Sequence, residues 1–403
     1  MKILKEITPT EFEKKKAFSK INSFLSNLNF RDAKLELGGS FAKDTWLKNN
    51  FDVDVFVRFP YDKYKTKDIS KILQNRLKKA KVVHGSRDYF QIKKKKFIYE
   101  FIPVLDIKHA KDAKNITDVS PLHMIWVKKH EGYSNQIRLA KKFCKANGLY
   151  GAESHIRGFS GYVLEVLIIY YKSFMDFVKA ACDWKEGDVI DVEKHYLNNK
   201  DVLEKLNKDK YSPLVVIDPV DKNRNAAASL SKEKFEKFIG LCRKFMRNPS
   251  DEFFKDKKID IKELKLKSNG NKFVLFNIKL LQGKRDIVGG KVLKVFAYIG
   301  KKIQEADFKL IDSNWNFESK LLWYYVKNEH LSEYKKHYGP PIKEEKHLEL
   351  FKKKWKGYEL YDDSTRVFVR VKRKYKEIKG FIKELVKNDY IKENVKGIRF
   401  RVY

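Results

Sequence analysis

The first third of the chain alternates between helix-like and strand-like hydrophobic patterns. Apolar residues recur at helical spacing over residues 10–28, beneath a face rich in lysine. Residues 66–79 predict a second amphipathic helix, and short apolar runs predict strands at 34–37, 51–57, 81–84, 89–92 and 97–105. We therefore expect residues 1–125 to form a small α/β head domain.

The pattern is mainly helical from residue 126 and mixed again from residue 257. Helices are predicted at 135–147, over a strongly apolar stretch at 162–177 and at 231–246, with one buried strand at 214–217. The last third predicts a strand at 273–278, a helix at 292–303, strands at 308–311 and 320–326, a hairpin around Asp362 and a final helix at 375–387. We expect a helical middle domain over 126–256 and an α+β domain over 257–403, of a kind that often binds RNA.

A glycine-rich turn lies where the strand at 34–37 ends. Gly38 and Gly39 let the backbone approach a ligand closely and adopt positive φ. Ser40 follows in the position of a helix N-cap. Because a helix N-terminus carries unpaired N–H groups and partial positive charge, this turn is a candidate phosphate cradle. Taken alone, Gly-Gly-Ser is more often an ordinary turn.

Two aspartates lie in the next strand, at 51–57. Val53, Val55 and Val57 would face the core, so Asp52 and Asp54 project together from the opposite face. Hard oxygen ligands placed in this way suit Mg²⁺. Two Mg²⁺ ions about 3.5–4 Å apart would hold an attacking hydroxyl, an α-phosphate and a leaving pyrophosphate in line. The strand, turn, helix and Asp-x-Asp strand together predict a triphosphate cradle beside a metal site.

Such a centre needs a third acidic residue from a neighbouring strand, and the chain offers two candidates. Glu100 and Asp106 share strand parity if the strand that begins at residue 97 runs straight through. Pro103 argues against continuous pairing, and Glu100 lies in the stronger β run. We favour Glu100. Asp106 is the alternative, and would otherwise be a strand-end residue in a charged loop.

The chain carries a large excess of positive charge. It has 88 Lys and Arg against 53 Asp and Glu in 403 residues, a formal net charge of +35. This excess implies a polyanionic partner, with nucleic acid as the first candidate, although a lysine-rich proteome would produce the same excess without one.

Cysteine usage and hydropathy bear on the compartment. Cys144, Cys182 and Cys242 lie far apart without CxxC spacing, which favours reduced thiols in a cytoplasmic protein over a zinc or disulfide framework. The charged N-terminus does not resemble a signal peptide, and Glu165 interrupts the longest apolar stretch, at 162–171. No membrane span is predicted.

A series of short motifs runs along nearly the whole chain. They are Gly-Ser-Phe-Ala-Lys-Asp-Thr-Trp-Leu at 39–47, Asp-Val-Asp at 52–54, Lys-Ala-Asn-Gly-Leu-Tyr-Gly-Ala-Glu at 145–153, Arg-Gly-Phe-Ser-Gly-Tyr at 157–162, Asp-Pro-Val-Asp at 218–221 with Arg224 and Asn225, and His-Tyr-Gly-Pro-Pro at 337–341. In content and order the series resembles the archaeal, class I, CCA-adding enzymes. Each short match is weak, but the ordered series is specific.

This resemblance implies a fold and an activity. The fold would be a polymerase-beta-like nucleotidyltransferase head, a helical middle domain and an α+β RNA-binding C-terminal region. The activity would be the addition or repair of the 3′-terminal CCA of tRNA, from CTP and ATP, with Mg²⁺ and without a nucleic-acid template. The expected partner is the acceptor stem and 3′ end of tRNA, and a homodimer is left open.

The resemblance also implies catalytic and phosphate-binding residues. Asp52, Asp54 and Glu100 match the family's catalytic, metal-binding carboxylates, with Glu100 at a position where the family usually has Asp. Ser40 and Lys43 match phosphate-cradle positions. The family commonly has Arg in place of Lys43, and lysine keeps the charge but loses the bidentate fork of arginine.

Four further positions match the family's nucleotide pocket. His123, Lys141 and Tyr150 match residues that line the pocket, and Arg224 matches an arginine that helps select the base. Without the resemblance, His123 is more simply a structural histidine, Lys141 a solvated helix charge and Tyr150 a cover for a helix end.

Basic and aromatic residues alternate in the last third, at 352–356 and 366–374. The second segment suits a strand with one cationic face in contact with the tRNA backbone. The alternative is a solvated edge strand blunted by lysine. The motif at 337–341 is expected to form a rigid turn.

Two other functions remain open at this level. One is a different nucleotidyltransferase of the same superfamily, such as a poly(A) polymerase or an oligoadenylate synthase. The other is a catalytically silent tRNA-binding protein, which would bind tRNA without releasing pyrophosphate.

Overall fold

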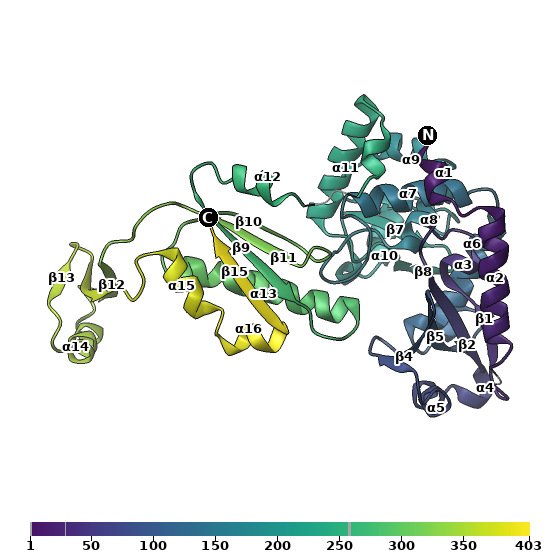
Figure 1. The fold of residues 1–403 in the computed structure, drawn as a ribbon, viewed down its shortest axis with the longest axis horizontal. Helices are drawn as coiled ribbons and strands as arrows, with labels where there is room; N and C mark the ends of the chain where they lie inside the picture. Colours follow the sequence, from purple (N-terminus) through teal and green to yellow (C-terminus); the bar gives the residue numbers. More distant parts are fainter. Residues whose placement is uncertain (1, 29, 257–258) are drawn as a thin grey trace. The chain divides into compact units, whose positions relative to one another are not determined.

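The computed structural model describes residues 2–28, 30–256 and 259–403. The chain folds into two compact units, Met1–Lys258 and Ile259–Tyr403 (Figure 1). The expected domain limit between residues 256 and 257 borders on residues 257 and 258, which lie outside the described part of the chain. The division of the first unit into a head and a middle domain stays a prediction.

A five-stranded sheet forms the core of the head region. Its strand order is β1-β2-β5-β4-β3, in which β2 and β5 are parallel and the other neighbours antiparallel. The strands are β1 (Lys34–Leu37), β2 (Asp52–Pro60), β3 (Lys81–Val83), β4 (Tyr89–Lys94) and β5 (Phe97–Asp106). All five strands expected from the sequence are present, and Pro103 does not interrupt β5.

The two faces of this sheet differ in what covers them. Val53, Val55 and Val57 are fully buried in an apolar cluster with residues of four helices. The helices are α2 (Glu11–Leu25), α3 (Gly39–Ala42), α4 (Tyr61–Tyr64) and α5 (Ile69–Arg76). On the opposite face Phe56 packs against Met124 of α6 (Ser120–Lys129). The alternation predicted for this strand is therefore confirmed, and its two aspartates lie on the face away from α2.

A second apolar cluster holds the helical part of the first unit together. Its helices are α1 (Ile3–Ile7), α6, α7 (Ser134–Ala146), α8 (Gly161–Tyr171), α9 (Phe174–Ala181) and α11 (Lys232–Arg247). Helix α1 thus packs with the middle region although it begins the chain. One helix through residue 177 was expected, but Lys172 takes a positive φ of 70° and ends α8, and Ser173 caps α9.

A small sheet of order β6-β7-β8 completes the first unit. Its strands are β6 (Asp188–Ile190), β7 (Leu214–Asp218) and β8 (Asp221–Asn225), and helix α10 (Asn199–Lys205) lies between the first two in sequence. Every residue of β7 is buried, as the apolar run at 214–217 predicted.

The second unit contains an antiparallel sheet of order β10-β11-β9-β15. Its elements are α12 (Ile261–Leu266), β9 (Lys272–Lys279), α13 (Arg285–Glu305), β10 (Leu310–Asn316), β11 (Leu321–Val326), α15 (Ile378–Leu385), α16 (Asp389–Asn394) and β15 (Gly397–Val402). Helices α13, α15 and α16 share an apolar cluster with one face of the sheet. The expected β-α-β-β order is confirmed. Strand β15 was not predicted, because its partner β9 lies more than a hundred residues away in sequence.

A three-stranded sheet of order β12-β14-β13 forms the other part of this unit. Its elements are β12 (Tyr334–Pro341), α14 (Glu345–Lys354), β13 (Leu360–Asp362) and β14 (Arg366–Lys372). The hairpin at Asp362 is confirmed. The motif at 337–341 is part of edge strand β12, so the prediction of a rigid turn is wrong. Its prolines are tolerated because they lie on an edge strand, at a register shift after Tyr338.

Among the described residues, no helix is long and apolar enough to cross a membrane.

Candidate active site

The turn after β1 begins with two glycines, as the sequence suggested, but the N-cap of the helix that follows is not the expected Ser40. Helix α3 (Gly39–Ala42) starts at Gly39, and Gly38 occupies the N-cap position. Ser40 is the second residue of the helix, so its predicted capping role is wrong. The backbone N–H of Gly38 donates to the carbonyl of Asp54 at 2.8 Å, which ties the turn to β2.

Gly39 lets the carboxylate of Asp54 lie directly against the turn. Its φ is +58°, in the left-handed region. A Cβ atom at this position would lie 1.6 Å from Oδ2 of Asp54. Glycine is therefore required here for two separate reasons, backbone conformation and space.

The parallel register of β2 and β5 brings three carboxylates to one region of the sheet. Asp54 lies opposite Glu100, and Asp52 lies on the same face two residues earlier. Gln91 of β4 lies opposite Glu100 on its other side and donates to Oε1 at 2.6 Å. Asp106 instead lies opposite Pro60 at the other end of the strand and forms an ion pair with Arg58. The structure thus groups Glu100, and not Asp106, with the two aspartates.

The electrostatics at Asp54 suit a cation. Burial raises the pKa of Asp54 to about 6, the charges of Lys43 and Lys141 oppose this rise, and the charge of Asp52 adds to it. Within the described residues, no three His, Cys, Asp or Glu side chains close around one metal position. Mg²⁺ is usually held by one or two carboxylates together with water and substrate phosphates, so this open set of oxygen donors fits the ion.

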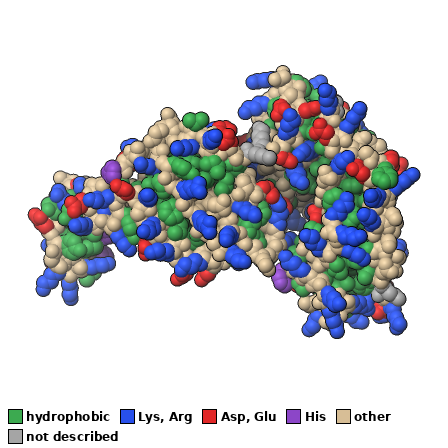
Figure 2. Space-filling model, viewed as in Figure 1, with side chains coloured by type: hydrophobic (Ala, Val, Ile, Leu, Met, Phe, Trp, Pro, Cys, Tyr) green, Lys and Arg blue, Asp and Glu red, His purple; other side chains and the backbone are tan. Residues whose placement is uncertain are grey.

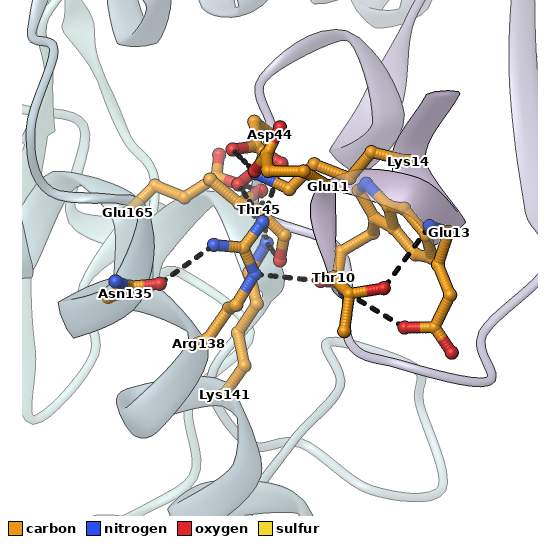
Figure 3. A network of polar contacts seen from close by, with 11 residues as sticks. Thr10, Glu11, Glu13, Lys14, Asp44, Thr45, Asn135, Arg138, Lys141 and Glu165 are labelled. Carbon is orange, nitrogen blue, oxygen red and sulfur yellow. Dashed lines mark hydrogen bonds and ion pairs between the residues drawn. The ribbon is translucent and has the colours of Figure 1, made fainter. Parts of the chain in front are cut away.

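A buried polar network lies beside the turn and joins it to α7 and α8 (Figure 3). Glu165 of α8 accepts hydrogen bonds from Lys43 Nζ at 2.5 Å, Lys141 Nζ at 2.7 Å and Thr45 Oγ1 at 2.9 Å. Burial alone would raise the pKa of Glu165, but the charges and hydrogen bonds of Lys141 and Lys43 outweigh burial and lower that pKa to about 2. Glu165 is therefore ionised.

Arg138 of α7 binds the backbone of the loop that follows α3 (Figure 3). Its guanidinium donates to the carbonyls of Asp44 at 2.5 Å and Trp46 at 3.0 Å, and to Oδ1 of Asp44 at 2.6 Å. Lys14 of α2 pairs with the other carboxylate oxygen of Asp44 at 2.8 Å. Asp44 has a positive φ of 49°, so this loop conformation is held from both sides.

Tyr150 lies close to this network. A Cβ on Gly161, the first residue of α8, would lie 2.8 Å from the Tyr150 hydroxyl. Burial raises the pKa of Tyr150, and the charges of Glu165 and Asp54 add to the rise. The tyrosine is therefore within electrostatic reach of the carboxylate site.

His123 and Arg224 meet at a second cluster, organised by Asp218 at the end of β7. Nε2 of His123 lies 2.8 Å from Oδ2 of Asp218, Arg224 forms an ion pair with the same oxygen, and Tyr162 donates to Oδ1 at 2.9 Å. The His123 and Tyr162 rings stack, with centroids 4.0 Å apart. Burial lowers the pKa of His123, and the charges of Arg224 and Lys43 contribute to that fall while Asp218 opposes it. Lys43 therefore acts electrostatically on both clusters.

Sequence reasoning missed the residues that hold the others in place. Glu165 and Asp218 contact predicted site residues, and Arg138 contacts the loop that follows α3. None of the three was singled out as a site residue. A signal existed for two of them. Glu165 is a lone acid in an apolar helix, and Asp218 ends a fully apolar strand. Arg138 gave none, because a basic residue on an amphipathic helix is ordinary.

We expect Gly39→Ala to destabilise the first unit more than Gly187→Ala does. Both glycines have positive φ, so each substitution costs about 1–2 kcal/mol in backbone strain. Gly187 has no atom within 4 Å of the added Cβ, whereas Gly39 meets Asp54 and should cost about 1–3 kcal/mol more from overpacking. Urea unfolding of both variants measures the difference. Equal losses would show that Asp54 does not press on the turn.

Three successive stretches of the chain match known families. Residues 15–117 match the nucleotidyltransferase domain, residues 135–255 match the second domain of tRNA nucleotidyltransferase, and residues 285–396 match the C-terminal domain of CCA-adding enzyme. These ranges cover the head region, the helical region and most of the second unit.

Curated relatives and one solved structure agree with these matches. The CCA-adding enzyme of Nanoarchaeum equitans is 36% identical over 311 residues, covering 76% of each chain. That of Methanosarcina barkeri is 30% identical over 412 residues, covering 95% of this chain and 87% of the relative. The Cid1 poly(U) polymerase shares the fold of 64% of this chain and 97% of its own, with a TM-score of 0.50 and 13% identity. The head region thus has a polymerase-beta-like nucleotidyltransferase fold, and the chain belongs to the archaeal CCA-adding enzyme family.

Proposed function

We propose that this chain, as a CCA-adding enzyme, transfers nucleotides from CTP and ATP to the 3′ end of tRNA at the site formed by Asp52, Asp54 and Glu100. The observation that carries this proposal is the register that sets Asp54 opposite Glu100, beside the Gly38–Gly39 turn. The order of the matched families along the chain supports the same assignment.

Asp52, Asp54 and Glu100 would hold Mg²⁺ on the face of the sheet that lies away from α2. When bound, Mg²⁺ supplies Lewis-acid activation of the 3′-hydroxyl and neutralises charge on the phosphates. The close approach of Asp54 to Gly39 fixes that carboxylate beside the turn in which the triphosphate would lie.

Ser40 and Lys43 would contact the triphosphate, with Lys141 adjacent to them. Lys43 and Lys141 bring two positive charges to one negative charge on Glu165, so this network keeps a net positive charge. In the reaction the tRNA 3′-hydroxyl oxygen forms a bond to the α-phosphorus, and the bond from the α-phosphorus to the leaving pyrophosphate breaks.

His123, Tyr150 and Arg224 would contact the nucleoside. Asp218 fixes the guanidinium of Arg224 on one side, and the remaining N–H groups of Arg224 can reach acceptors on a base edge. Base selection at the Watson–Crick edge is the usual way in which proteins read an unstacked nucleotide.

The second unit would dock the body of the tRNA. Lys and Arg side chains are spread over much of the surface seen in Figure 2. Strand β14 is the central strand of its sheet, so the edge-strand alternative is wrong. Arg366, Arg370 and Lys372 are exposed and share one of its faces, while Arg373 is mostly buried and pairs with Asp307.

Substitution of the carboxylates tests the catalytic site. The Asp52→Ala, Asp54→Ala double variant should incorporate no labelled CTP into tRNA that lacks its CCA end, because both strand ligands are removed. Glu100→Ala should also abolish incorporation, whereas Asp106→Ala serves as the matched control and should retain it. Incorporation by the double variant would rule out this mechanism, and inactivity of Asp106→Ala together with full activity of Glu100→Ala would reverse the assignment of the third carboxylate.

Removal of the exposed charges of β14 tests the docking surface. The triple variant Arg366→Ala, Arg370→Ala, Lys372→Ala should bind tRNA more weakly, because fewer phosphates are neutralised. The negative slope of log K for tRNA binding against log salt concentration should become shallower, by up to about 0.9 for each phosphate that the variant no longer neutralises. The control removes three exposed lysines of α2, Lys15, Lys16 and Lys20, and changes net charge equally. An equal effect of both triples in filter binding would mean that β14 contributes only to the overall charge.

A further inference from the structure

We propose that Glu165 is a positioning residue that holds the ammonium groups of Lys43 and Lys141 side by side for the triphosphate of the incoming nucleotide. This inference rests on the proposed function and extends it to a residue that does not itself contact substrate. Glu165 is fully buried on α8, and it touches a lysine from the head loop and a lysine from α7 at once.

The geometry makes one carboxylate the common partner of both lysines. Lys43 Nζ donates to Oε2 at 2.5 Å, and Lys141 Nζ donates to Oε1 at 2.7 Å. Thr45 Oγ1 also donates to Oε1 and accepts from Lys141 Nζ at 2.8 Å, so both carboxylate oxygens are engaged. Because each lysine has its own carboxylate oxygen, neither displaces the other.

The charges explain why a carboxylate is needed at this position. The two ammonium groups repel each other and are largely removed from solvent. The pKa of Lys141 is lowered overall by burial, and the charge of Lys43 adds to this fall while the charge and hydrogen bond of Glu165 oppose it. Two positive charges and one negative charge leave a net charge of +1 beside the carboxylate site, and an anionic triphosphate would be attracted to it.

The network is also placed to act on the substrate. Lys43 directly follows α3, and Gly39 at the start of α3 lies against the carboxylate of Asp54. The short helix that precedes Lys43 therefore begins beside one of the carboxylates proposed to bind Mg²⁺. A triphosphate bridging those carboxylates and the turn would lie beside the two ammonium groups.

A purely structural role for Glu165 would largely duplicate the role of Arg138. Arg138 already fastens the backbone of the loop through the carbonyls of Asp44 and Trp46. The hydrogen bonds that the Glu165 carboxylate accepts from Lys43, Thr45 and Lys141 all come from side chains. The specific contribution of Glu165 is therefore to hold the ammonium groups of Lys43 and Lys141 in place.

Glu165→Gln tests the proposal because it keeps the shape of the side chain and removes its charge. The KM for CTP and the KM for ATP should rise by the same factor, about tenfold or more. Although the formal charge of the network becomes more positive, the two ammonium groups lose the shared partner that holds them side by side, so their contacts to the phosphates weaken. The kcat should change much less, because the missing interaction acts on binding of the ground state and transition state alike. The increase in KM should be equal for CTP and ATP, because an effect on base selection would change the two KM values by different factors.

Binding of inorganic tripolyphosphate, measured by calorimetry without RNA, gives a second readout that does not depend on activity. Glu165→Gln should weaken this binding by the same factor as the KM values. The matched control is Asp118→Asn, which removes a fully buried carboxylate of the same unit that pairs with Arg87 and the N–H of Leu105. It should lower thermal stability and leave tripolyphosphate binding unchanged.

A double variant covers the case in which Glu165→Gln does not fold. Lys141→Gln combined with Glu165→Gln removes the repulsion between the lysines and keeps a net charge of +1, but only one ammonium group remains. It should fold and still bind tripolyphosphate more weakly than the wild type. Wild-type affinity in either folded variant would overturn the positioning role. A wild-type chain that bound tripolyphosphate but added no nucleotide would instead contradict the proposed function.

Discussion

The parallel pairing of β2 and β5 is the constraint on which the site depends. Because residues in register on neighbouring strands face the same way, this pairing sets Asp54 opposite Glu100 and leaves Asp106 at the far end with Arg58. The apolar residues of β2 face α2, α4 and α5, so burial of the core fixes which face the acids occupy. A shift of one residue in this strand would move both aspartates to the buried side.

Buried charge is the second organising feature, and it joins the head region to the helices. Arg138 and Glu165 come from α7 and α8, yet their partners lie in the loop that follows α3. Such pairs stabilise a fold only when every charged group is compensated, and removal of one partner is costly. The loop conformation and the charges near the carboxylates are therefore set by the helical region. A head domain without these helices would lack both.

Much of the fold could be predicted from local patterns, because its core strands and helices carry clear periodicity. The strands of the head sheet, the β-α-β-β order of the second unit and the hairpin at Asp362 follow from hydrophobic spacing and turn residues. Strand β15 could not be predicted in this way, since its pairing with β9 is nonlocal. The break after Tyr171 depends on one positive φ at Lys172, which composition does not reveal.

For the candidate site, the sequence pointed to residues proposed to contact metal or substrate and missed the residues that hold them in place. Asp52, Asp54 and Glu100 stand out because acids in apolar strands are unusual, whereas Glu165 resembled an interruption of an apolar stretch. The single measurement that tests the central claim most directly is the length of products from tRNA lacking its CCA end, resolved at one nucleotide. The account predicts addition of C residues with CTP alone, no tail with ATP alone, and a complete CCA followed by arrest with both nucleotides. A growing tail of A residues with ATP alone, or addition that continues beyond CCA, would contradict it.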